Sequence, residues 1–204
     1  MESKIKRVKV FLGVLCAMLV VAGCAPTAKN IDPNSEFTTM GLDYNNLKGV
    51  MAEMIDSLLQ DRYTQSLSKD NPKVVAISDI INDTPQKVDV ESLSRELTRA
   101  MRRSGKFKLT MAVARSGGSV DGMIGDSRNL RDNKEFNQYT TAEEGTLSAP
   151  SLSLSGKIGQ TIHRMGKNKK VDYYILLTLT DIKTGEVIWD DQRDISKMGN
   201  ANLW

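Results

Sequence analysis

The side chains that could carry out catalysis are few, and their spacing does not suit it. His163 is the only histidine, so no second imidazole exists to share a metal ion. The serines within residues 151–155 alternate along an expected strand and lack the Gly-x-Ser-x-Gly elbow of a hydrolase. Asp190 and Asp191 are neighbours, so on a strand they point to opposite faces. We expect no catalytic residue and no metal site. The alternative is an enzyme in which carboxylates distant in the sequence come together, as in a glycosidase.

The glycines of residues 115–127 are the second place to look for chemistry. The segment matches neither GxGxxG nor a Walker loop, because no Gly-Lys-Ser/Thr follows. We expect a mobile surface loop here, with no phosphate site and no small-molecule substrate.

Cys24 is where the sequence does predict chemistry. Four basic residues within the first nine precede the apolar residues 10–22, which are too few to span a bilayer but suit a signal peptide. The sequence then runs Val21-Ala22-Gly23-Cys24, which resembles the lipobox of bacterial lipoproteins. That resemblance implies cleavage between Gly23 and Cys24 and a covalent lipid on Cys24, whose several acyl chains would anchor the chain stably. The alternative is an ordinary signal peptide with Cys24 merely near its cleavage site.

Cleavage would change the charge balance of the chain, and the residue after Cys24 indicates the membrane in which the lipid is anchored. The 204 residues carry 28 Lys+Arg and 25 Asp+Glu, a net charge of +3. Removing residues 1–23 takes away four basic residues and Glu2, which leaves 181 residues with 24 charges of each sign. A neutral chain gives no reason to expect a nucleic-acid partner. Residue 25 is not the Asp that retains enterobacterial lipoproteins in the inner membrane, so we expect the outer membrane, facing the periplasm.

The remaining chain divides into a tether and one domain. We expect a signal peptide over 1–23, the lipidated Cys24 with a short flexible tether over 24–42, and a domain over 43–204. Apolar residues recur at helical spacing from Leu47 to Leu59, which predicts a helix from Asp43 to about residue 62. We interpret this stripe as core; a partner-binding face is the alternative. Leu93, Leu97 and Met101 predict a second helix with a basic last turn before Gly105.

Strands account for most of the rest. We expect strands over 74–77 and 107–113, a weak helix near 128–138, and then alternating strand residues from Leu152 to Ile162. A polar turn over 164–170, a central strand over 171–179, a turn at 183–185 and a returning strand complete an antiparallel meander. His163 falls on the outward face of the first of these strands. The fold class is α+β, a two-layer domain with a mixed sheet.

The order of motifs is similar to that of the LpoB family. A lipobox and tether precede a strand ending Asn82-Asp83-Thr84, a helix running into Ser-Gly-Lys-Phe (residues 104–107), and a hairpin with Thr-Gly-Glu-Val-Ile-Trp (residues 184–189). The resemblance covers about 43–197 and implies a domain like the N-terminal domain of TolB. It also implies a non-catalytic outer-membrane activator of a class A penicillin-binding protein. Two features depart from the family: the tether is short, and residues 115–150 look like an insertion or a replacement of the family's helical pair.

The resemblance leaves the contact surface open. We expect partner binding by the basic hairpin tip of Arg164, Lys167, Lys169 and Lys170, which would steer toward an acidic patch. A polar turn that only serves solubility is the alternative. A lipoprotein that scaffolds a secretion or flagellar basal structure is the alternative function. No cofactor is expected beyond the lipid on Cys24.

Overall fold

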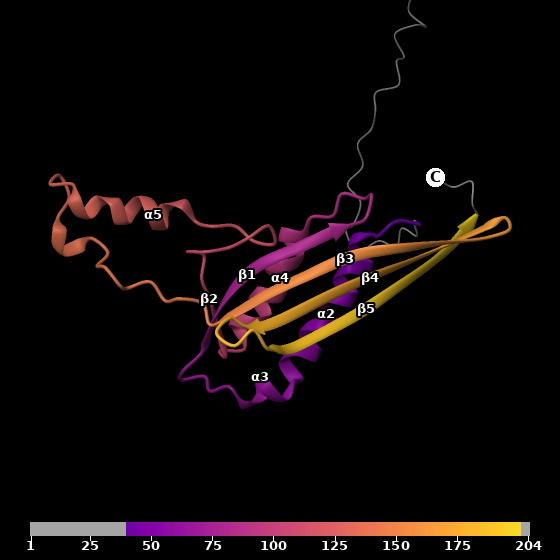
Figure 1. Cartoon of the computed structure of the whole chain (residues 1–204), viewed down its shortest axis with the longest axis horizontal. Helices are drawn as coiled ribbons and strands as arrows, with labels where there is room; N and C mark the ends of the chain where they lie inside the picture. The colour runs from indigo at the N-terminus through magenta and orange to yellow at the C-terminus, as the bar shows by residue number, and fades with distance from the viewer. Residues whose placement is uncertain (1–39, 201–204) are drawn as a thin grey trace, which may run out of the picture. The chain divides into compact units, whose positions relative to one another are not determined.

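Five strands form one mixed sheet in the order β2-β1-β3-β4-β5 (Figure 1). The structure, a computed structural model, describes residues 40–200, so the predicted signal peptide, Cys24 and most of the tether lie outside the described residues. β1 pairs in parallel with both β2 and β3, and β3, β4 and β5 form the predicted antiparallel meander. The strands are β1 (Lys73–Asp83), β2 (Phe107–Leu109), β3 (Leu152–Met165), β4 (Asn168–Asp181) and β5 (Val187–Asn200).

Two long helices cover one face of this sheet, as Figure 1 shows. They are α2 (Tyr44–Gln60), which continues into the short α3 (Arg62–Ser66), and α4 (Val90–Arg103). The stripe of α2 is core as predicted, because Leu47, Met51, Met54 and Leu58 are all buried against the sheet. The fold is therefore the predicted two-layer α+β domain.

The helix ends follow from local sequence. Asp43 caps α2 by accepting a hydrogen bond from the Asn46 N–H at 2.8 Å. Asp89 caps α4 in the same way through the Ser92 N–H. Gly105 follows the end of α4 with φ of +75°, a left-handed conformation that glycine adopts without strain. The predicted second helix and its stop are thus confirmed.

Between β2 and β3 the structure differs from the predictions. β2 ends at Leu109, and Met111 and Val113 are exposed, because the chain leaves the parallel ladder there. The helix expected near 128–138 is instead α5 (Gly122–Asn129), followed by η1 (Leu130–Asp132) and η2 (Gln138–Thr140). Its start is set by Asp121, which accepts from the Met123 N–H at 3.1 Å. This cap outweighs the poor helix propensity of Gly122 and Gly125.

The outer part of the β3–β4 hairpin extends past the helical layer. Ile162 keeps the alternation of the buried face, yet 46% of its surface is exposed. Its neighbour across β4 and β5 is Lys197, which contacts Asp43 at the very start of α2. No part of α2 lies beyond that point to cover Ile162, which is why its side chain is exposed although the predicted alternation holds.

Candidate functional site

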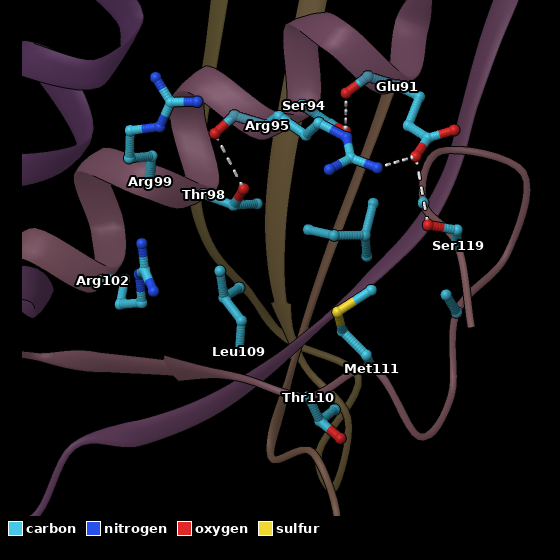
Figure 2. A pocket seen from close by; sticks show the side chains of 13 residues that line it. Glu91, Ser94, Arg95, Thr98, Arg99, Arg102, Leu109, Thr110, Met111 and Ser119 are labelled. Carbon is cyan, nitrogen blue, oxygen red and sulfur yellow. Dashed lines mark hydrogen bonds and ion pairs between the residues drawn. The ribbon is translucent and has the colours of Figure 1, made fainter. Parts of the chain in front are cut away.

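A hollow of about 380 Å³ lies between α4, the end of β2 and residues 114–119. Figure 2 shows Arg95, Thr98, Arg99 and Arg102 on the α4 side, with Leu109 and Met111 across from them. We call this set of six residues the arginine groove. It combines a cationic helix face with an apolar opposite side.

The arginines of the groove follow from the helical repeat of α4. Leu97 and Met101 have no exposed surface and hold the helix on the sheet. Residues 95, 99 and 102 lie on the other side, spaced by four and three positions. Arg95 pairs with Glu91 at 2.5 Å, and hydrogen bonds from Arg95 and then Ser119 hold the pKa of the Glu91 carboxyl below its usual range. Within residues 40–200, Arg99 and Arg102 have neither an ion pair nor a side-chain hydrogen bond.

The glycine-rich segment forms a wall of the groove. Ser94 Oγ donates a hydrogen bond to the Gly117 carbonyl at 2.8 Å, and the Gly117 N–H donates to the Ser78 carbonyl at 3.0 Å. A Cβ on Gly117 would lie 2.4 Å from that Ser78 oxygen, so only glycine allows so close an approach to β1. Residues 115–119, part of the predicted mobile loop, form a loop that is hydrogen-bonded to β1 and α4.

Asp79 fixes the same segment from the side of β1. Its carboxylate accepts hydrogen bonds from Arg115 Nε at 2.5 Å and from the hydroxyl of Ser116 at 2.7 Å. The Arg115 contact, followed by those of Ser116, lowers the pKa of Asp79. The wall is therefore held by charged as well as backbone contacts.

A second hollow, of about 510 Å³, lies on the other side of the α4 arginines. It is bordered by Ile55 and Leu59 of α2 and by Arg99 and Arg103 of α4. Arg99 borders both hollows, so α4 forms a cationic ridge with a hollow on each flank. Guanidinium groups bind carboxylates bidentately, and arginine beside apolar surface is typical of protein interfaces. This surface suits a protein segment that carries acidic and apolar side chains.

The predicted basic tip does form, at a separate place. Arg164 and Lys169 are direct partners across the β3–β4 hairpin, with Lys167 in the turn between them. Gly166 begins this turn with φ of +60°. Lys170 pairs with Asp172 at 2.8 Å. The tip and the arginine groove share no residue.

The remaining polar candidates do not assemble into a catalytic group. His163 is exposed as predicted, and its Nε2 lies 3.6 Å from Asp172 Oδ2. Ser196 Oγ donates to the same carboxylate at 2.5 Å, so Asp172 separates the serine from the imidazole and no nucleophile–base pair forms. Asp191 accepts from Arg193 on its own strand. Over residues 40–200, no three His, Cys, Asp or Glu side chains are grouped to hold a metal ion.

Sequence reasoning found the tip but not the groove. The signal was present, since Arg95, Arg99, Arg102 and Arg103 lie opposite Leu97 and Met101 in the α4 repeat. The apolar side of the groove depends on Leu109 and on residues 114–119 reaching α4 through tertiary contacts, which periodicity does not predict. Among the described helices, none has the length and apolarity needed to cross a bilayer.

The fold and this surface define a class, a two-layer α+β domain with a cationic, partly apolar binding groove. Residues 46–195 match the model of a family described as the peptidoglycan-synthase activator LpoB. The chain belongs to the LpoB family, which is a family of activators of another enzyme.

Solved structures give weaker likenesses. The LpoB C-terminal domain from Escherichia coli is 15% identical with a TM-score of 0.41, and the match covers 74% of this chain and 99% of that one. The corresponding domain from Salmonella enterica is also 15% identical, with a TM-score of 0.40, and the match covers 74% of this chain and 99% of that one. Lipoprotein GNA1162 from Neisseria meningitidis is 12% identical, with a TM-score of 0.33, and the match covers 65% of this chain and 90% of that one. No curated protein sequence matches significantly. The assignment therefore rests on the family match.

Proposed function

We propose that this chain is an outer-membrane lipoprotein that binds a class A penicillin-binding protein and activates its synthesis of peptidoglycan. The family match over residues 46–195 carries this proposal. The lipid on Cys24 holds the domain in the periplasm, and the domain acts by contact rather than by catalysis. No cofactor, nucleic acid or small-molecule substrate has a role.

Activation follows from differential binding. A regulator that binds the active conformer of the synthase more tightly than the inactive one raises the population of the active conformer. A tenfold difference in affinity between the conformers, about 1.4 kcal/mol, changes their ratio tenfold.

We place the synthase contact at the arginine groove rather than at the hairpin tip. Arg99 and Arg102 stand beside Leu109 and Met111, so cationic and apolar contacts occur together there. Hot spots of protein interfaces combine such features, and arginine is enriched among them. At the tip, by contrast, Lys170 is already paired with Asp172.

The test is a glycan-polymerisation assay of a purified class A synthase with and without the lipidated protein. We expect stimulation by the wild type and its loss in R99E/R102E, with binding weakened at least tenfold. The matched control is the triple variant of Lys167, Lys169 and Lys170 to Glu, which should stimulate normally. A wild type that neither binds nor stimulates the synthase contradicts the function. Full stimulation by R99E/R102E together with failure of the lysine variant would move the contact to the tip.

A further inference from the structure

The first described residues are held against the sheet at one place. The Tyr173 hydroxyl donates to the Met40 carbonyl at 3.0 Å, and the Leu42 N–H donates to Gln86 Oε1 at 2.9 Å. Asp43 then pairs with Lys197 at 2.6 Å, with 21% and 11% of these side chains exposed. The point at which the chain from Cys24 reaches the domain is therefore fixed by β4, β5 and the loop between β1 and α4.

This point lies close to the β3–β4 turn. Tyr173 is five residues after the start of β4, which corresponds to about 17 Å along the strand. α2 then runs back along β5, because Asp43 meets Lys197 while Ser57, near the end of the helix, meets Trp189. In Figure 1 the start of α2 likewise lies toward the hairpin side of the sheet. The tether thus joins the domain at the end that carries the basic tip.

The composition of this end is that of a membrane-surface contact. We define the hairpin end as residues 162–172 and 197–200. It carries Arg164, Lys167, Lys169 and Lys170 against one carboxylate, Asp172, while the largely buried Lys197 is paired with Asp43. Two large apolar side chains flank these cations on opposite faces of the hairpin end, Ile162 with 46% and Met198 with 66% of its surface exposed. Basic residues next to exposed apolar ones are typical of segments that bind anionic lipid surfaces.

We propose that the hairpin end docks on the anionic headgroups of the membrane in which the Cys24 lipid is anchored. This inference rests on the lipid anchor of the proposed function. The 16 residues from 24 to 39 span at most about 55 Å, which keeps the hairpin end within reach of the bilayer. The arginine groove shares no residue with the hairpin end, so docking leaves it accessible to a protein partner.

The experiment uses the lipidated protein in vesicles with a quencher on the lipid headgroups. A fluorophore is attached at N168C, beside the hairpin turn, or in the matched control at K183C, in the exposed turn between β4 and β5. Vesicles of phosphatidylethanolamine with 30% phosphatidylglycerol are compared with neutral vesicles. Flotation of the wild type, with Cys24→Ala as its control, measures the anchor separately.

Docking predicts quenching at N168C but not at K183C, only in anionic vesicles, and reversed by 0.5 M NaCl because salt screens the charges. In the N168C protein, the further substitution R164Q should weaken binding of the hairpin end to anionic vesicles about fivefold, which corresponds to about 1 kcal/mol for the loss of one cation. Equal quenching at both positions, or quenching indifferent to phosphatidylglycerol, would overturn the inference while the protein still floats. Failure to float would instead contradict the anchor. If the fluorescence of the N168C label changes on addition of the synthase but not of lipid, the hairpin end contacts the synthase, which also overturns the inference.

Discussion

Asp43 shows how much one side chain contributes at the residue scale. One carboxylate oxygen caps α2 through the Asn46 N–H, and the other pairs with Lys197 on β5. Burial alone raises the pKa of Asp43, but the hydrogen bond and charge of Lys197, together with the Asn46 N–H, outweigh it and leave the pKa below 3.8. Stability from this group is therefore present above pH 3.8 and is lost as the pH falls through the lowered folded-state pKa.

Two substitutions separate the roles of Asp43. Asp43→Asn keeps an oxygen for the cap but loses the ion pair, so we expect a loss of about 1–3 kcal/mol in the free energy of unfolding. Asp43→Ala loses the cap as well, which adds about 1 kcal/mol. Urea denaturation at pH 7 measures both. As the pH falls below 3.8, the wild type should lose its advantage over Asp43→Asn; an unchanged difference would show that the Asp43 carboxylate is not its source.

At the scale of elements, the helices and strands with clear apolar periodicity and turn residues were predicted, and the features that depend on tertiary contacts were not. α2, α4 and the meander were predicted because their periodicity and turn residues are local: Gly105 stops α4, and Gly185, with φ of +77°, turns the chain into β5. β2 was predicted too long because its length depends on where β1 offers hydrogen-bond partners, and α5 was misplaced because its start is set by the Asp121 cap and not by an apolar repeat. The groove was missed because Gly117 reaches Ser78 and Ser94 only in the folded domain.

Gly117 provides the test of that tertiary dependence. Gly117→Ala places a methyl group 2.4 Å from the Ser78 carbonyl and 2.7 Å from Ile80 Cγ1, so the loop must move off β1. We expect a loss of about 1–3 kcal/mol, the usual cost of overpacking, and a weaker response to the synthase. Thermal unfolding followed by circular dichroism measures the stability.

Gly125→Ala is the matched control, because a Cβ there meets nothing within 4 Å. On an exposed helix this change should be neutral or stabilising by up to about 1 kcal/mol. Equal destabilisation by the two substitutions would contradict the close packing of Gly117.

At the scale of the whole domain, one long segment lies outside the core. No residue from 118 to 151 is buried, and α5 packs no side chain into the sheet. The segment is held mainly by its own polar contacts, such as those of Arg128 with the Glu143 carbonyl and with Thr146. The strand after it, β3, pairs directly in parallel with β1, and β1 also pairs in parallel with β2, the strand before it. The sheet is therefore continuous from β2 through β1 to β3 without a strand from residues 118–151.

Limited trypsin digestion tests this separation. Lys134 is exposed in the segment, whereas Lys157 lies within β3 and pairs with Asp83 at 2.7 Å. Cleavage after Lys134 needs only local opening, while cleavage after Lys157 needs the sheet to open, so the first should be faster by orders of magnitude. The nicked protein should stay in one piece on gel filtration and unfold in one transition, because β1 remains paired with β3. Similar cleavage rates at the two lysines, or separation of the fragments, would show that the segment is part of the cooperative core.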